Sequence, residues 1–201
     1  LSIVSYNIMS AYDRLERVFE KFSEVDVLCV QGTQLEVRLA PKDGRPKQDV
    51  NQVRRETMSP CGGFYCISWG HNRRGAGSNK GCGIIIALNV KTLPKELIHT
   101  RYDPPQKFAG RWGAIRLSDN ALFDLVIGNI YHFQEDTPDN VKQAFWHVVN
   151  TDMSNMPRRA ARVIAGDYNG DVGPRHCNDR LIGNAYPNHD ESSNSEFLSA
   201  F

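Results

Sequence analysis

Amide, carboxylate, phenol and imidazole side chains stand at the points where apolar segments of the sequence end. These residues are Asn7, Gln31, Tyr131, His132, Asp167 and Asn169. Carboxylate and amide oxygens are ligands that suit Mg²⁺, and a metal together with amide and phenol donors stabilises phosphoryl oxygens. If the apolar segments are neighbouring strands, their ends share one rim that suits a divalent cation and a phosphate. Each residue alone has an ordinary alternative, because Asn, Asp and Gly are common in turns.

The apolar segments that precede these residues are short enough to be strands. Strands are expected at residues 1–6, 26–31, 64–69, 82–88, 97–102, 111–117, 123–131 and 162–165. Apolar residues at helical spacing predict a helix over 11–22, and shorter helices are expected at 48–58 and 196–201. The intervening stretches 32–47 and 71–80 are rich in polar residues and glycine or proline, which is typical of loops.

A longer helix is expected to begin near Thr137. Thr137 suits the N-cap, Pro138 the first helical position and Asp139 the first turn. Its apolar face comprises Val141, Phe145, Val148 and Val149. The order of strands and helices predicts an α/β sandwich with helices outside, because the strands do not alternate strictly with helices.

The composition is that of one globular domain spanning residues 1–201. Hydrophobic residues make up 40% of the 201 residues, charged residues 23%, and the net charge is +1. These values exclude a charged disordered tail, a collagen-like repeat and a disulfide-stabilised miniprotein. No apolar run approaches the roughly 20 residues that a membrane helix needs, so no membrane span is expected.

Basic residues are unevenly distributed along the chain. Between positions 36 and 80 there are nine Lys and Arg residues against four Asp and Glu residues. This bias is compatible with a phosphate-bearing partner, although ordinary solvated loops explain it equally well. The candidate nucleic-acid contacts are Arg73, Arg74, Lys80 and Arg111.

The cysteines and the first residues bear on the cellular location. There are five cysteines, an odd number without a Cys-x-x-Cys pair, which favours a reducing intracellular compartment over disulfides or zinc. The sequence begins at Leu1 and enters an apolar strand directly, so either a leader has been removed or the chain is a fragment.

Several segments, in order, resemble the endonuclease/exonuclease/phosphatase superfamily, which includes DNase I-like, abasic-site and retrotransposon endonucleases. The matching segments are LSIVSYN at 1–7, VLCVQ at 27–31, GCGIIIAL at 81–88, GR at 110–111, IGNIY at 127–131 and IAGDYN at 164–169. The resemblance covers nearly the whole chain. It implies a four-layered αββα sandwich of two mixed β-sheets, and relative to this family the chain lacks the C-terminal strands.

The resemblance also implies roles for residues of the rim. Asn7 and Asp167 would hold Mg²⁺ or Mn²⁺, and Asp167 would orient or activate the attacking water. Asn169 would contact the scissile phosphate. Either Tyr131 or His132 would support the phosphate or the leaving group. The implied reaction is metal-assisted hydrolysis of a phosphodiester by an in-line water.

Two departures from the family pattern argue against catalysis. Gly32 follows Gln31 where the family has a metal-binding Glu, and the nearest acidic residue is Glu36. The Asp-His segment at the family's C-terminal strand is also absent, since His176 and His189 stand in other contexts. Magnesium is held by few protein ligands, so the loss of one weakens the site, and the loss of a catalytic His costs about 10²–10⁴-fold in rate.

Three functional hypotheses follow. The first is a pseudoenzyme that has lost catalysis and acts as a binding or scaffold subunit, with a protein partner covering the open side of the incomplete sheet. The alternative is an active Mg²⁺-dependent endonuclease or phosphodiesterase acting on DNA or RNA. The third is a nucleic-acid-binding module that uses the basic region without hydrolysis.

Overall fold

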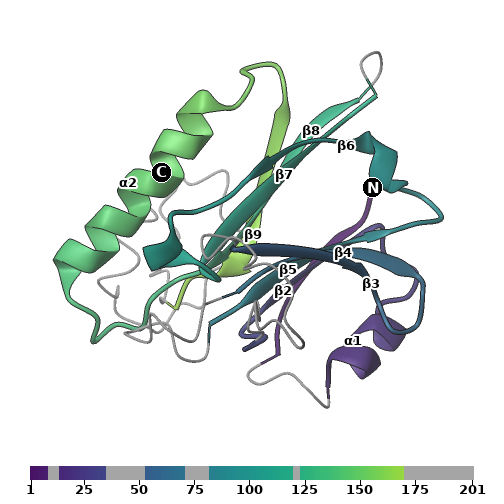
Figure 1. Ribbon diagram of the computed structural model, residues 1–201, viewed down its shortest axis with the longest axis horizontal. Coiled ribbons are helices and arrows are strands. Elements are labelled where there is room, and N and C mark those ends of the chain that lie inside the picture. Colours follow the sequence, from purple (N-terminus) through teal and green to yellow (C-terminus); the bar gives the residue numbers. More distant parts are fainter. Residues whose placement is uncertain (9–13, 35–52, 71–81, 120–122, 170–201) are drawn as a thin grey trace, which may run out of the picture.

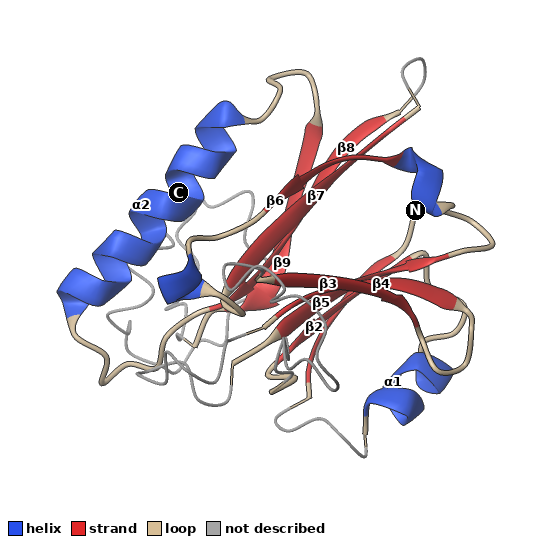
Figure 2. Cartoon of the chain, in the orientation of Figure 1, coloured by secondary structure: helices blue, strands red, loops and turns tan. Residues whose placement is uncertain are grey.

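Two β-sheets pack face to face, and one α-helix lies on the outer side of each (Figures 1 and 2). The computed structural model describes residues 1–8, 14–34, 53–70, 82–119 and 123–169. One buried cluster fills the space between the sheets, and two others lie between each sheet and its helix. This arrangement confirms the predicted α/β sandwich.

The first sheet has five strands in the order β1-β2-β5-β4-β3. These are β1 (Ile3–Asn7), β2 (Val27–Gln31), β3 (Arg54–Met58), β4 (Phe64–Trp69) and β5 (Ile84–Asn89). β1 and β2 are parallel and the other pairs are antiparallel, so the sheet is mixed. The short helix α1 (Leu15–Lys21) buries Val18 and Phe19 against its outer face.

The second sheet has four strands in the order β6-β7-β8-β9. These are β6 (Ile98–Tyr102), β7 (Trp112–Ser118), β8 (Asp124–Tyr131) and β9 (Ala161–Asp167), with the short 3₁₀ turns η2 (Lys95–Leu97) and η3 (Gln106–Phe108) between strands. Helix α2 (Asp139–Asn155) connects β8 to its parallel neighbour β9 and packs Phe145, Trp146 and Val149 on the outer face. No helix among the described residues is long and apolar enough to cross a membrane.

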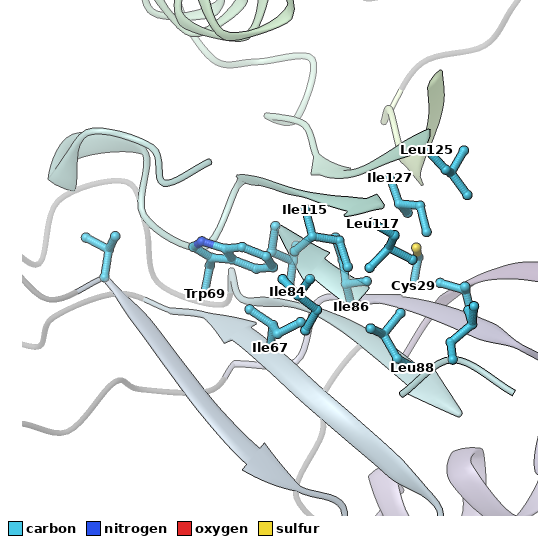
Figure 3. Packing of buried hydrophobic residues seen from close by; sticks show 14 of the residues in the cluster. Cys29, Ile67, Trp69, Ile84, Ile86, Leu88, Ile115, Leu117, Leu125 and Ile127 are labelled. Atoms are coloured by element: carbon cyan, nitrogen blue, oxygen red, sulfur yellow. The ribbon is translucent and has the colours of Figure 1, made fainter. Parts of the chain in front are cut away.

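The core between the sheets is built from alternating side chains of both sheets (Figure 3). Its members include Cys29, Ile67, Trp69, Ile84, Ile86, Leu88, Ile115, Leu117, Leu125 and Ile127. Trp69 is fully buried, and its indole nitrogen donates to Asp103 at 2.8 Å. The indole ring lies against Gly113, where an added Cβ would stand only 2.4 Å from a ring carbon. Glycine at position 113 is therefore required by the packing of Trp69.

Two local predictions are wrong. The structure has strand β3, not a helix, over the described part of the segment 48–58, and residues 48–52 lie outside the described residues. Glu56 accepts hydrogen bonds from Tyr65 at 2.6 Å and from Arg101 at 2.7 Å, partners distant in sequence that favour the strand. Helix α2 begins at Asp139 with Pro138 as its N-cap and without a side-chain capping bond, so Thr137 does not have the expected capping role.

The other expected elements are found within a few residues of their predicted bounds where the structure describes them. The helix expected at 11–22 corresponds to α1, and residues 9–13 lie outside the described residues. The helix expected at 196–201 also lies outside them.

The close contact at position 113 gives a stability prediction. Gly113→Ala forces a methyl group into the Trp69 ring, and overpacking of this kind costs about 1–3 kcal/mol. Gly63→Ala is the matched control, because an added Cβ at Gly63 meets nothing within 4 Å. Urea denaturation of the two variants measures the difference. Equal stability of the two variants would contradict the packing described here.

Candidate functional site

The carboxyl ends of two parallel strand pairs, one from each sheet, meet at one rim of the molecule. In β1 and β2, Asn7 is paired in register with Gln31, and in β8 and β9, Tyr131 is paired with Asp167. The Asn7 side-chain amide donates a hydrogen bond to the Asp167 carboxylate, which joins the two sheets at this rim. The structure thus brings together two predicted site residues that are 160 positions apart in sequence.

The Gly-Asp-Tyr-Asn motif forms this rim through specific backbone geometry. Gly166 passes so close to β8 that an added Cβ would stand 2.3 Å from the Ile130 carbonyl oxygen. Asp167 Oδ1 accepts a hydrogen bond from the Asn169 backbone amide at 2.9 Å. Asn169 has a φ of 47°, a left-handed conformation that Asn adopts more readily than most residues. Its side chain donates to the His132 carbonyl oxygen at 2.8 Å, so the motif is tied to the end of β8.

Tyr131 and His132, the two alternatives for one role, lie in different environments. Tyr131 is partly exposed at the rim, and burial followed by the nearby Asp167 carboxylate raises the pKa of its hydroxyl. His132 is only 1% exposed, and its ring lies 5.4–6.0 Å from the rings of Phe133, Phe145 and Trp146. Its ring nitrogens have no hydrogen-bond partner within the described residues. The His132 side chain therefore lies in the core, and only its backbone contacts the rim residues. The Tyr131 side chain lies at the rim itself.

Gly32 follows Gln31 at the rim with a φ of 66°, in the left-handed region that favours glycine. In the described part of the chain, no group of three or more His, Cys, Asp or Glu side chains is arranged to hold a metal ion. The carboxylate at the rim is Asp167, whose two oxygens accept hydrogen bonds from Asn7 and Asn169. Asn7 and Asp167 are the predicted metal ligands that the structure brings together, and Gly32 adds no side-chain ligand to them. Glu36 lies outside the described residues.

Arg111 lies beneath the rim. It is 7% exposed, and its guanidinium donates to the carbonyl oxygens of Tyr131 at 3.3 Å and His132 at 3.0 Å. The guanidinium carbon lies 3.9 Å from the centre of the Phe133 ring, and burial lowers the pKa of the group. In the structure Arg111 is buried and holds the end of β8, and the nucleic-acid contact expected of it stays a prediction. Arg73, Arg74 and Lys80 lie outside the described residues.

A pair of buried amide side chains behind the rim joins the two sheets, and the sequence analysis did not predict this contact. Gln31 Nε2 donates to Asn129 Oδ1 at 2.7 Å, and both residues are fully buried. Asn129 Nδ2 donates to the carbonyl oxygens of Val30 at 3.1 Å and Ile85 at 2.9 Å. A lone amide inside the apolar segment 127–130 is the signal that points to this residue.

The comparisons with known proteins agree with this fold. No protein-family profile and no curated protein match the sequence. Among solved structures, AP endonuclease LMAP of Leishmania major superposes with a TM-score of 0.59 at 18% identity, over 99% of this chain and 64% of that chain. The 3′ phosphatase NExo of Neisseria, bound to a product DNA hairpin, has a TM-score of 0.57 at 16% identity, over 86% of this chain and 59% of that chain.

A third structure carries the superfamily name. It is an endonuclease/exonuclease/phosphatase family protein of Bacteroides thetaiotaomicron, with a TM-score of 0.51 at 14% identity, over 100% of this chain and 68% of that chain. At these identities the likeness concerns the fold alone, and the chain spans about three fifths of the length of the first two proteins. The chain therefore shares its fold with nuclease and phosphatase structures, one of which is named as an endonuclease/exonuclease/phosphatase family protein.

The buried histidine predicts a pH dependence of stability. Burial, and then the positive charges of Lys142 and Arg111, lower the pKa of His132 from 6.5 to about 4. Below pH 6.5 the unfolded chain binds a proton that the folded chain excludes, so stability falls as pH falls from about 6.5 to about 4. The expected slope from this residue is about 1.4 kcal/mol per pH unit.

Urea denaturation at several pH values between 7.5 and 4.5 measures this dependence. His132→Phe removes the titrating group and is expected to flatten the curve. His147→Gln is the control, because His147 is exposed on α2. If the two variants have the same pH profile, the destabilisation at low pH has another source.

The amide pair predicts a large cost for a change at Asn129. Asn129→Leu removes the acceptor of Gln31 and leaves the carbonyl oxygens of Val30 and Ile85 without this donor. Unsatisfied buried polar groups cost about 1–3 kcal/mol each, so we expect a loss of at least about 2 kcal/mol in urea denaturation. Asn150→Leu on the exposed side of α2 is the control and should change stability by less than about 0.5 kcal/mol. If Asn129→Leu also changes the free energy of unfolding by less than about 0.5 kcal/mol, the hydrogen bonds of Asn129 do not stabilise the fold as described.

Proposed function

We propose that this chain is a nucleic-acid-binding subunit with a nuclease fold that has lost metal-dependent hydrolysis. The observation that carries the proposal is Gly32. It follows Gln31, the register partner of Asn7, at the position where the resemblance implies a metal-binding Glu. Glycine offers no side-chain ligand. Its left-handed φ of 66° also suits glycine better than glutamate, since other residues pay about 1–2 kcal/mol in this region.

The hydrogen bonds of Asp167 support the same proposal. One carboxylate oxygen accepts from the Asn7 side chain and the other from the Asn169 backbone amide. Both oxygens are therefore engaged with the protein, and the carboxylate stabilises the rim in the absence of a metal. Each carboxylate oxygen keeps a further lone pair, but a metal ion bound there would gain few further protein ligands.

Nucleic acid is the ligand class that the rim and the comparisons favour. The Tyr131 phenol is a hydrogen-bond donor that suits phosphate oxygens. The Asn7 and Asn169 amides are of the same donor type, and in this structure they donate to Asp167 and to the His132 carbonyl oxygen. The neighbouring NExo structure holds a DNA hairpin, and LMAP is an AP endonuclease. The excess of basic residues between positions 36 and 80 is a further argument for a polyanionic ligand.

An active Mg²⁺- or Mn²⁺-dependent nuclease is the second candidate. It is favoured by the contact between Asn7 and Asp167 and by Asn169, which keep the residue types of the family pattern. A third candidate shares the loss of hydrolysis with the first proposal but has a protein partner in place of nucleic acid, so that the chain acts as a scaffold subunit. It is supported by Val163 of β9, an apolar residue that is 37% exposed.

Plasmid nicking together with binding in EDTA tests the proposal. Supercoiled plasmid and a short RNA are incubated with the protein in Mg²⁺, in Mn²⁺ and in EDTA. Binding of a fluorescent 20-base-pair duplex is measured in EDTA by anisotropy. We expect binding without metal and no cleavage above the level of Asp167→Ala.

Asp136→Ala is the matched control, because Asp136 is an exposed aspartate outside the rim. Metal-dependent cleavage that Asp167→Ala abolishes and Asp136→Ala retains would establish the active nuclease instead. Absence of binding to both DNA and RNA at low salt would refute the nucleic-acid ligand and leave the protein scaffold.

A further inference from the structure

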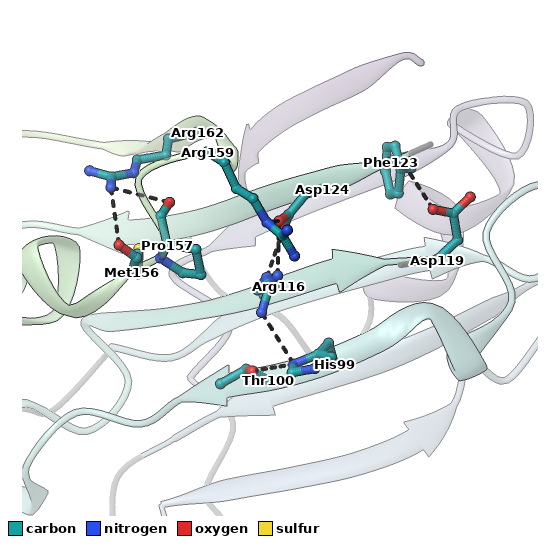
Figure 4. Close-up of polar contacts among 10 residues, drawn as sticks. All are labelled: His99, Thr100, Arg116, Asp119, Phe123, Asp124, Met156, Pro157, Arg159 and Arg162. Carbon is teal, nitrogen blue, oxygen red and sulfur yellow. Dashed lines mark hydrogen bonds and ion pairs between the residues drawn. The ribbon is translucent and has the colours of Figure 1, made fainter. Parts of the chain in front are cut away.

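A group of arginines lies on the outer face of the four-stranded sheet, at the end opposite the rim. Figure 4 shows Arg116, Arg159 and Arg162 of this group. Arg116 lies on β7, Arg162 on β9, and Arg158 and Arg159 in the turn between α2 and β9. Arg158, Arg159 and Arg162 are exposed, and the Arg159 side chain keeps 73% of its surface accessible. We call these three residues the distal arginine patch.

One carboxylate holds this region together without neutralising it. Asp124 accepts from Arg116 at 2.7 Å and 2.8 Å, and from Arg159 Nε at 3.0 Å. The hydrogen bonds from Arg116 lower the pKa of the Asp124 carboxyl to about 2, so it stays charged at neutral pH. Arg162 donates to the carbonyl oxygens of Met156 at 3.3 Å and Pro157 at 3.5 Å, which carry no charge.

The remaining charges leave an excess of guanidinium groups. Arg158 forms no ion pair within the described residues. Two other carboxylates lie near this face. Asp152 on α2 is partly buried and accepts from the Trp112 indole at 2.7 Å, and Asp119 is exposed just after β7 and accepts from the Phe123 backbone amide at 2.9 Å (Figure 4). Three arginines and one carboxylate, Asp119, are therefore exposed in this region, which leaves an excess of positive charge at the surface.

Guanidinium groups match the geometry of phosphate and bind it with two parallel hydrogen bonds. Arg159 binds Asp124 through its Nε, and its two terminal nitrogens carry the other donors of the guanidinium. We propose that the distal arginine patch binds the phosphate backbone of nucleic acid as a second contact, separate from the rim. This inference rests on the proposed nucleic-acid binding and adds a surface to it.

Strand β9 sets the distance between the two contacts. Arg162 lies near its start and Asp167 at its end, five positions apart. At about 3.3 Å per strand residue this is roughly 17 Å, which corresponds to roughly five base pairs at 3.4 Å each. A duplex of 20 base pairs is therefore long enough to reach both the rim and the distal arginine patch.

The test compares two double substitutions of exposed arginines. Arg158→Ala with Arg159→Ala removes two charges from the patch, and Arg14→Ala with Arg17→Ala removes two from α1 under the other sheet. Anisotropy with a 20-base-pair DNA duplex and a 20-nucleotide RNA is measured in EDTA over a series of salt concentrations. The patch variant is expected to bind about tenfold more weakly at low salt. Its slope of log K against log salt should fall by about 1.8, because each lost phosphate contact contributes about 0.9.

The α1 variant is expected to keep the affinity and the slope of the unchanged protein. Arg158→Lys with Arg159→Lys should keep the slope, because it preserves the charges while removing the guanidinium geometry. Thermal melting of each variant identifies any loss of binding that is caused by unfolding. The lysine variant then shows whether positive charge at the patch is enough for binding.

Three outcomes would overturn the inference. If the unchanged protein binds and the alanine patch variant has the same affinity and slope, the patch is not a contact, and the proposed function stands. If the unchanged protein binds neither DNA nor RNA, the proposed function fails together with this inference. If the patch variant loses binding to polyglutamate but not to DNA, the patch is a surface for an acidic protein.

Discussion

The candidate site depends on the buried amide pair Gln31–Asn129, which joins the two sheets directly behind the rim. Gln31 is paired with Asn7 on β1, and Asn129 is paired with Ala165 on β9, two residues before Asp167. The hydrogen bond between these two side chains therefore fixes the position of one sheet relative to the other along the strand direction. That relative position brings Asn7 next to Asp167. Apolar contacts alone specify such an offset weakly, whereas a buried amide without its partner is costly. The geometry of the rim follows from this polar contact inside an otherwise apolar core.

Holding the rim in shape and hydrolysing a phosphodiester make different demands on the same residues. The hydrogen bonds of Asp167, Asn169 and the His132 backbone form a closed network without a metal ion. Such a network can be retained for stability after a metal ligand is lost, since none of these bonds involves the side chain at position 32. The presence of Asn7, Asp167 and Asn169 is thus compatible with an inactive protein, and Gly32 is the more informative residue about catalysis.

Gln31 and His132 were expected at the rim but are buried behind it, whereas the strands and the other rim residues follow from local patterns of the sequence. The run of apolar residues at 26–31 and the Gly-Asp-Tyr-Asn motif are examples. Failures occurred where distant partners decide the structure. Residues 54–58 form a strand because Glu56 meets Tyr65 and Arg101, and Arg111 is buried because β8 supplies carbonyl oxygens for its guanidinium. Such partners are not visible in the local pattern of residues.

The separation between the rim and the distal arginine patch bears on how binding can persist without catalysis. In protein–nucleic acid complexes, release of counterions from the phosphate backbone supplies much of the affinity, and it depends on cationic side chains. The described rim side chains are mostly neutral donors with one carboxylate, while the exposed guanidinium groups of the patch lie at the other end of β9. Under the proposed function, affinity therefore resides largely in the patch and positioning of the backbone in the rim. Replacement of a metal ligand by Gly32 would then remove hydrolysis at one end of the strand and leave most of the binding energy at the other.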